Sequence, residues 1–578
     1  MAGIAEKANN YTLPTASSSI LGGIKVGDGL IIDSGVLSLK DNALSTVIYF
    51  TQQAPSSISS TYVGVYHVLS NINIAGTVTN KSNMAFYSNG TAVNELTIAT
   101  GRIFTCMDGS KYQATDTGWS LLADSMDVVQ ETGTSTTNVM SQNAVTLALN
   151  NVAIENQWYG VEFDTTVSDP TCTRIGGNRD LHRTLPVQSK MRRCLLSDAG
   201  VVQAYLDAND STLLANGQPA DLTGAMGQVM VEMEGYVKYE TEGNKRRVKM
   251  SQFALDGYSY FHYFISAYKA TVQRSTLKLA SVMNTTEDYR GGNNNADWDG
   301  TYRSFLGLPA NTISLTNFRA YARNRGTAGR GGAGWNCLVY DVYKTLYWSF
   351  VVEYATLNCQ KAINSALTSE GYRQGGLGMG LTTALSNWGQ WTTYNSNQST
   401  CPCGYTNSLG NNTGEIIYDK SEYDSTWSKT AVINSYRGVE CPFGDTWNWV
   451  DGILVNVQSA DAGGTSKVYV CHDPVLFSST SFENYECIGE EARSSGYGKT
   501  HLFGSEGDMI ADTIGGGTSS YLCDYRYVSI PNSGTNLRCL DFGGHLYGGS
   551  TAGFSCSASD TAPSTAGGYF GSRLCFLP

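Results

Sequence analysis

The distribution of apolar and polar residues predicts many short β-strands and few helices. In residues 12–40 the chain reads TLPTASSSILGGIKVGDGLIIDSGVLSLK, where short apolar runs are separated by Gly-rich turns. Asp33-Ser34-Gly35 is suited to a hairpin turn. Apolar and polar residues also alternate in Tyr62–Val68 and, less regularly, in Gln228–Glu234. A unit as short as residues 12–40 cannot bury a core alone, so we expect it to need neighbouring repeats or other chains.

Helical periodicity is clear in three segments. In residues 129–150, Met140, Ala144, Leu147 and Ala148 fall on one face of a short helix. Such a helix is marginal in water alone, so we expect it to pack against copies of itself. The clearest helix is predicted over 342–367 and a second over 311–321.

These elements divide the chain into five predicted regions. They are a short repeat segment (1–44), a small β domain (45–128), a linker helix (129–157), a β-rich shoulder domain (158–257) and one large domain (258–578). The large domain combines the two longer helices with short strands and long Gly-, Trp- and Asn-rich loops. We therefore expect a multidomain, mainly β protein with an α+β C-terminal domain.

Composition excludes several classes of protein. Only 15% of residues are charged, and the chain has 63 Gly, 35 Tyr and 12 Pro, which argues against disorder and against collagen. The net charge of −12 disfavours nucleic acid as a partner. The apolar stretch 338–357 contains Asp341, Lys344 and Glu353, so it is expected in a core and not in a membrane. The start, MAGIAEKANN, lacks the apolar segment of a signal peptide, so synthesis in a cytosol is expected.

Signatures of catalysis and of metal binding are weak. The sequence contains no G-x-S-x-G, H-E-x-x-H or P-loop motif, and its six His are scattered. Glu490 and Glu491 are adjacent on an extended segment and should point apart, whereas glycoside hydrolysis needs two facing carboxyls. The 14 Cys lack zinc-site spacing, so we expect buried thiols with one or two bridges at most. We expect no catalytic residue, no cofactor and no metal.

The C-terminal end has the composition of a binding surface. Residues 436–452 contain a dense aromatic group beside turn residues, which fits a core cluster under loops. In residues 539–575 small residues separate large aromatic ones, and Lys, Glu and Asn are absent. Tyr-, Ser- and Gly-rich surfaces are typical of antibody paratopes. The alternative is an ordinary Gly-rich loop of a β domain.

Several segments resemble phage proteins. Residues 12–40 and the sequence GTSTTNVMSQNAV at 133–145 resemble modules of phage tail fibres and their collars. Four further segments and the GG…AG…GSRLC ending resemble the C-type-lectin-fold variable proteins that diversity-generating retroelements target, and more closely the receptor-binding tail fibres of phages infecting gut anaerobes. The four segments are 289–304, 345–358, 369–380 and 436–452.

The resemblance implies a C-type-lectin fold, in its formylglycine-generating-enzyme-like variant, on a trimeric fibre-like N-terminal region. Residues 1–44 would then be a fibre or collar repeat that mediates attachment, and 129–157 a trimerising linker. A variable region is implied at about 520–575, where adenine-directed mutagenesis rewrites side chains on a constant frame. The frame positions would be Gly543, Gly544, Ala552, Gly553, Gly571, Arg573, Leu574 and Cys575. The variable positions, which would bind the receptor, would be His545, Leu546, Tyr547, Ser550, Thr551, Phe554, Ser555, Ser557, Ser559, Asp560, Thr565, Tyr569 and Phe570, with Asp524, Tyr525, Arg526, Tyr527, Asn536 and Asp541 as further candidates.

The function implied by the resemblance is adhesion without catalysis. The expected partners are a bacterial surface receptor, either protein or glycan, and other virion tail or baseplate proteins. A homotrimer is implied, at the distal tail fibre of a virion, made in the host cytoplasm, with no nucleic-acid partner and no membrane insertion. Two alternatives stay open: a tailspike-type enzyme that degrades surface polysaccharide, and a passive fibre or baseplate component. The Glu-Pro-Asn and Trp-Asn-Asp triplets of calcium-dependent sugar-binding lectins are absent.

Overall fold

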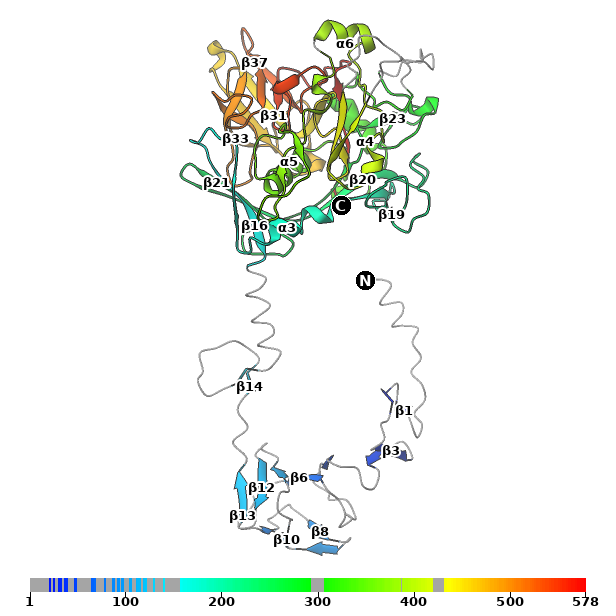
Figure 1. The fold of residues 1–578 in the computed structure, drawn as a ribbon, viewed down its shortest axis with the longest axis vertical. Coiled ribbons are helices and arrows are strands. Elements are labelled where there is room, and N and C mark those ends of the chain that lie inside the picture. The colour runs from blue at the N-terminus through cyan, green and yellow to red at the C-terminus, as the bar shows by residue number, and fades with distance from the viewer. Residues whose placement is uncertain are drawn as a thin grey trace. The chain divides into compact units, whose positions relative to one another are not determined.

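The computed structural model describes residues 156–292, 306–385, 387–418 and 431–578, apart from the side chains of 393–395, together with the backbone of short strands between residues 20 and 140. Contacts divide the chain into two compact units, 1–150 and 151–578, both drawn in Figure 1. Each unit is described by itself.

The N-terminal unit contains only short strands in its described parts. They are β1 (Ile20–Leu21), β2 (Ile24–Lys25), β3 (Leu30–Asp33), β4 (Val36–Leu39), β5 (Thr46–Ile48), β6 (Gly64–Val68), β7 (Thr77–Thr79), β8 (Phe86–Ser88), β9 (Thr91–Val93), β10 (Glu95–Thr97), β11 (Ile103–Cys106), β12 (Lys111–Thr115), β13 (Gly118–Leu121), β14 (Val128–Val129) and β15 (Val139–Met140). Strands β3 and β4 pair with Asp33 opposite Val36, which confirms the two-residue hairpin turn. Strands β13-β12-β11-β6-β5 form one sheet. The helix predicted over 129–150 is wrong at Met140, because Val139–Met140 forms β15 and pairs in parallel with β14. The rest of the predicted helix lies outside the described residues, apart from Val129 in β14.

The first large sheet of the C-terminal unit joins segments from its two ends. Its main path is β17-β16-β21-β20-β22-β40-β25, and β18 pairs with β19 and β20. The strands are β16 (Trp158–Asp164), β17 (Thr173–Gly176), β18 (Arg192–Leu196), β19 (Val202–Tyr205), β20 (Gln228–Glu242), β21 (Lys245–Ser251), β22 (Ser259–Ser266), β25 (Trp335–Cys337) and β40 (Leu574–Phe576). Strand β40 pairs with both β22 and β25. The expected boundary between 158–257 and 258–578 is therefore wrong, because both segments contribute to one sheet and one core.

The first part of strand β20 is buried on both faces of this sheet. Val229 and Val231 belong to one core cluster, whereas Met230 between them belongs to another. Successive strand residues point to opposite faces. The imperfect alternation in the sequence thus reflects a strand that is covered on both sides.

The second large sheet is formed by strands between residues 447 and 571. Its main path is β33-β32-β31-β37-β38-β36-β34-β35, and β39 pairs with β31. The strands are β31 (Trp447–Gln458), β32 (Ser466–Val470), β33 (Glu486–Glu490), β34 (Gly496–His501), β35 (Ala511–Ile514), β36 (Tyr525–Val528), β37 (Thr535–Phe542), β38 (Ser557–Ser559) and β39 (Phe570–Gly571).

Helix α5 (Tyr340–Tyr354) is buried along its whole length. It contacts β16, β21 and β22 of the first sheet and β31 of the second. The prediction of a helix to residue 367 is wrong at its C-terminal end. Ala355 adopts a left-handed conformation with φ 52°, and its carbonyl accepts a hydrogen bond from the Cys172 amide at 2.8 Å. Tertiary pairing thus ends the helix where the apolar pattern continues.

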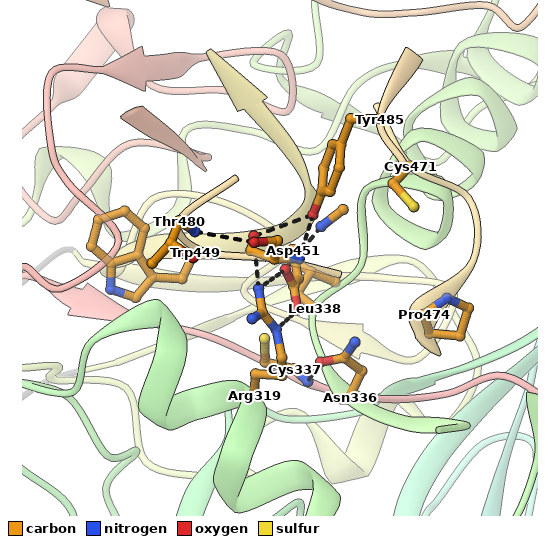
Figure 2. A network of polar contacts seen from close by, with 12 residues as sticks. Arg319, Asn336, Cys337, Leu338, Trp449, Asp451, Cys471, Pro474, Thr480 and Tyr485 are labelled. Atoms are coloured by element: carbon orange, nitrogen blue, oxygen red, sulfur yellow. Dashed lines mark hydrogen bonds and ion pairs between the residues drawn. The ribbon is translucent and has the colours of Figure 1, made fainter. Parts of the chain in front are cut away.

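Helix α4 (Leu315–Arg323) begins later than predicted. Ser314 caps it by accepting a hydrogen bond from the Asn317 amide. In Figure 2 Arg319 on this helix forms a bidentate ion pair with Asp451 on β31, with two N–O distances of 2.6 Å. Burial alone would lower the pKa of Arg319, but the neighbouring carboxylate outweighs it and raises that pKa. The pair fixes α4 against the second sheet.

The remaining elements of the C-terminal unit are short. They are α3 (Leu181–Thr184), α6 (Trp388–Asn395), β23 (Thr271–Gln273), β24 (Lys278–Ala280), β26 (Ile363–Asn364), β27 (Gln374–Gly375), β28 (Gly414–Ile417), β29 (Val432–Tyr436), β30 (Val439–Glu440) and the 3-10 helices η1 (Gln188–Lys190), η2 (Glu287–Tyr289), η3 (Arg330–Gly332), η4 (Gly380–Thr383), η5 (Asn407–Leu409), η6 (Ala460–Ala462), η7 (Pro474–Leu476) and η8 (Gly549–Thr551). Among the described residues, no helix has the length and apolar character needed to cross a membrane.

Candidate binding pocket

A pocket of about 440 Å³ opens where the second sheet meets its C-terminal loops. We call it the aromatic pocket. It is lined by Trp388, Trp447, Tyr527, Asp541, His545, Tyr547, Gly548, Thr551, Ala558, Asp560, Thr561, Tyr569 and Phe570. These residues come from α6, β31, β36, β37, β38, β39, the loop that contains η8 and the segment between β38 and β39. The volume lies in the range of sites that accept small organic groups.

Trp388 stands nearly perpendicular to three other rings of the aromatic pocket. Its ring centroid lies 5.1 Å from Tyr569, 5.9 Å from Tyr547 and 6.0 Å from His545, with interplanar angles of 68°, 76° and 67°. His545 and Tyr547 stack on each other at 4.6 Å. Helix α6 is capped by Asn387, which accepts a hydrogen bond from the Gln390 amide. Rings that meet at such angles form adjacent walls around a small volume.

The acidic groups of the aromatic pocket are the carboxyls of Asp541 and Asp560. Asp541 on β37 is only 1% exposed, and its Oδ1 has no hydrogen-bond partner among the described residues. Its Oδ2 accepts a long hydrogen bond of 3.3 Å from Thr561 Oγ1. Burial, and then the charge of nearby Asp560, raise the pKa of Asp541 well above its usual range. Burial lowers the pKa of His545 to about 4, so its imidazole is neutral at pH 7.

Glycines and one buried carboxylate shape the loop between β37 and β38. Gly543 and Gly544 have φ of 97° and 75°, which favour glycine. A Cβ on Gly544 would lie 2.7 Å from the Cβ of Ala552. Asp524 accepts hydrogen bonds from the Ser555 amide at 2.7 Å and the Ser555 hydroxyl at 2.9 Å. Burial raises the pKa of Asp524 to about 7. These contacts hold the backbone that presents His545 and Tyr547.

A buried ion pair contacts β38, the strand that follows this loop. Arg526 on β36 contacts Glu491, and their side chains are 1% and 0% exposed. Ser559 Oγ accepts a hydrogen bond from Arg526 at 2.5 Å and donates one to Glu491 at 2.6 Å. Glu490 is exposed whereas Glu491 is buried. The adjacent carboxylates therefore point apart and do not form a facing pair.

The structure brings together eight of the nineteen residues predicted to bind a receptor. The residues that line the aromatic pocket are Tyr527, Asp541, His545, Tyr547, Thr551, Asp560, Tyr569 and Phe570. Seven others are buried away from it: Asp524, Arg526, Leu546, Phe554, Ser555, Ser557 and Ser559. Four are partly exposed outside it: Tyr525, Asn536, Ser550 and Thr565. Whether any of the nineteen binds a receptor stays a prediction.

Phe554 was predicted to contact a receptor, but its side chain packs in the core. Its ring is 0% exposed. Its centroid lies 5.7 Å from Phe350 of α5 and 5.6 Å from Phe443. The sequence context of Phe554 is the same Gly- and Ser-rich stretch that surrounds Tyr547, so composition did not separate the two.

Sequence reasoning missed five residues that line the aromatic pocket. They are Trp388, Trp447, Gly548, Ala558 and Thr561. Trp388 is 38% exposed, which is unusual for so large an apolar side chain. The Asn387 cap followed by Trp388 and Trp391 was a usable signal for a short helix with an aromatic face. Trp447 was assigned to a core cluster, and it is 7% exposed at the pocket wall.

Residues that could hold a metal are not gathered in the described part of the chain. No group of three or more His, Cys, Asp or Glu side chains there is arranged to hold an ion. The thirteen described cysteines are free, and all but Cys487 are buried, as expected for unreactive thiols. Cys401 and Cys441 have their sulfurs 3.2 Å apart.

Comparisons with known proteins give limited similarity. No family model matches the sequence, and no curated protein matches it. Three solved structures align with 83% of this chain: the Major Tropism Determinant U1 variant (10% identity, 96% of that chain, TM-score 0.19), the P3c variant (11%, 95%, 0.18) and the I1 variant (11%, 96%, 0.19). TM-scores of this size establish no common fold.

Proposed function

We propose that this protein is a phage tail-fibre receptor-binding protein that attaches to a bacterial surface molecule through the aromatic pocket and the loop around it. The observation that carries the proposal is the pocket itself. It gathers Trp388, Tyr547 and Tyr569, three large aromatic side chains that are partly open to solvent, around one hollow. Exposed aromatic anchors in a pocket are the residues that dominate binding energies at protein surfaces.

The position of the pocket in the chain supports the same function. Eight of its thirteen lining residues are positions that the resemblance to retroelement-targeted lectin-fold proteins implies to be variable. Beneath them, the Arg526–Glu491 pair and the Asp524–Ser555 hydrogen bonds hold the backbone. A rigid scaffold that presents changeable surface side chains is suited to recognition. In this proposal the lectin-type fold, the variable region and the virion location follow from the resemblance.

In this proposal the protein acts as a homotrimer and has no catalytic activity. Three pockets on one fibre would raise the overall avidity above that of a single pocket by about 10²–10⁴ when all can engage. Glu490 is exposed and Glu491 is buried, so these adjacent carboxyls do not face a common volume as a glycosidase pair would. A test for shortening of surface polysaccharide by the full chain should show no change, and any shortening would favour a tailspike enzyme.

Cell binding by labelled full-length protein tests the adhesin proposal. The variants are Trp388→Ala, Tyr547→Ala and Tyr569→Ala, and the matched control is Tyr260→Ala, because Tyr260 is a 53% exposed aromatic residue on β22 outside the pocket. Flow cytometry over a panel of bacterial strains first identifies a strain that the unaltered protein binds. Removal of a central aromatic anchor costs about 2 kcal/mol or more, so we expect at least about thirtyfold weaker binding. If no strain is bound, or if the pocket variants bind like the Tyr260→Ala control, the proposal fails.

A further inference from the structure

We propose that the aromatic pocket recognises a protonated amine or guanidinium group on the receptor. This inference rests on the proposed function and names the chemical group that the pocket selects. Such a cationic group could belong to a lysine or arginine side chain of a protein or to an amino sugar of a glycan. The experiment below distinguishes these sources.

The charge of the pocket wall is the first argument. Asp541 and Asp560 supply two carboxyl groups, and Lys and Arg are absent from the thirteen lining residues. His545, whose pKa burial lowers to about 4, adds no positive charge at pH 7. An anionic group would lose its hydration without gaining a counter-charge, whereas a cation would gain one. The wall therefore selects against phosphate and carboxylate ligands.

The ring geometry is the second argument. The faces of aromatic rings carry negative electrostatic potential, and cations bind within about 6 Å of ring centroids. Trp388 lies 5.1 Å from Tyr569 and 5.9 Å from Tyr547, at steep interplanar angles of 68° and 76°. Walls set at these angles can surround one small cation on several sides. Trp388 also gives the strongest cation–π interaction of the three ring types.

The unpartnered oxygen of Asp541 is the third argument. Asp541 is 1% exposed, lines the pocket, and its Oδ1 lacks a hydrogen-bond partner among the described residues. A buried acceptor without a partner is destabilising, and an N–H donor from a ligand would satisfy it. An ionised donor would form the stronger, charge-assisted hydrogen bond. A cation would also lower the raised pKa of Asp541 and favour its ionised form, whereas a neutral hydroxyl ligand would not.

Ligand-observed NMR titrations of the full-length protein test the inference with matched probes. Nα-acetyl-lysine amide is compared with Nα-acetyl-norleucine amide, and glucosamine with glucose, while glucuronate serves as the anion. We expect one cationic probe to bind about tenfold or more tightly than its neutral counterpart, and glucuronate to show no binding. A lysine preference would indicate a protein source, and a glucosamine preference a glycan source. Equal binding of charged and neutral probes, or no binding of any probe, would overturn the inference.

Three variants locate the preference in the pocket. Asp541→Asn keeps the side-chain shape and should abolish the preference for the cation, as should Trp388→Ala. Asp560→Asn changes an exposed residue and should weaken the preference severalfold even if Asp541→Asn proves unstable. Asp256→Asn is the charge-matched control, because Asp256 is exposed outside the pocket, and it should bind like the unaltered protein. If Trp388→Ala abolishes cell binding while cationic and neutral probes bind equally, the amine inference is wrong and the adhesin proposal stands.

Discussion

Replacement of Arg526 by methionine tests whether this side chain stabilises the fold instead of contacting a partner. Arg526 pairs with Glu491, and their side chains are 1% and 0% exposed. Ser559 hydrogen-bonds to both of them, at 2.5 Å and 2.6 Å. Methionine has a similar length without the charge. Arg526→Met therefore leaves Glu491 as a buried carboxylate whose counter-charge is gone.

The expected loss is large because one half of a buried pair is removed. Breaking such a pair costs about 3–5 kcal/mol. Burial already raises the pKa of Glu491, and loss of Arg526 should raise it further. A carboxyl whose folded pKa exceeds its unfolded value loses stability as pH rises between the two values. The loss should therefore be smaller at pH 5 than at pH 8. The double variant Arg526→Met/Glu491→Gln removes both charges and should recover most of the stability.

Urea unfolding of the full chain, followed by tryptophan fluorescence, measures these differences. The midpoint for Arg526→Met should fall clearly below that of the unaltered protein, and the double variant should lie between them. A midpoint within experimental error of the unaltered protein would refute the structural role of Arg526. So would a double variant as unstable as the single one, since the unpaired charge of Glu491 would then not be the cause.

Two further predictions concern a loop glycine and a histidine. A Cβ on Gly553, whose φ is 148°, would lie 1.9 Å from Asp524 Oδ1, so Gly553→Ala should cost about 2–3 kcal/mol in urea unfolding. Gly549→Ala is its control and should cost only about 1 kcal/mol, because φ there is 54° but no atom lies within 4 Å. The hydrogen bond of 2.8 Å from His472 Nδ1 to Asp341 raises the pKa of His472. The pair of His472 and Asp341 thus contributes its full stability below about pH 6.5, the unfolded pKa of histidine. That contribution is lost as pH rises through the higher pKa of His472 in the folded protein. Unfolding midpoints of His472→Asn should accordingly vary less between about pH 6 and pH 8 than those of the unaltered protein, and an unchanged pH profile would contradict this role.

Local sequence patterns predicted local structure well where neighbours along the chain decide it. Strands β3 and β4 pair with Asp33 opposite Val36 as a two-residue hairpin requires, and short polar residues and glycine suit such a turn. The apolar segment around Leu346 is a buried helix as expected. Its end was not predictable, because Ala355 leaves the helix to bond with Cys172, a residue far away in the sequence.

The candidate site was predictable in part for the same reason. The aromatic content near the C-terminus pointed to Tyr547 and Tyr569, which line the pocket. It pointed equally to Phe554, which lies in the core. Irregular loops have no periodicity that separates an outward ring from an inward one. Trp388 was missed because it reaches the pocket from a different segment.

The sequence by itself determined the mainly β class, the low charge, the short turns and the concentration of Tyr, Ser and Gly near the C-terminus. These properties depend on residue types and on neighbours in the chain. Only the tertiary structure decided that β40 joins the same sheet as β22, and that Asp541 and Trp388 face one pocket. These contacts depend on strand pairing between segments that are distant in the sequence. That pairing buries some aromatic side chains and leaves others exposed to solvent. The partly open rings and the unpartnered carboxyl oxygen define the pocket, and both arise from that pairing.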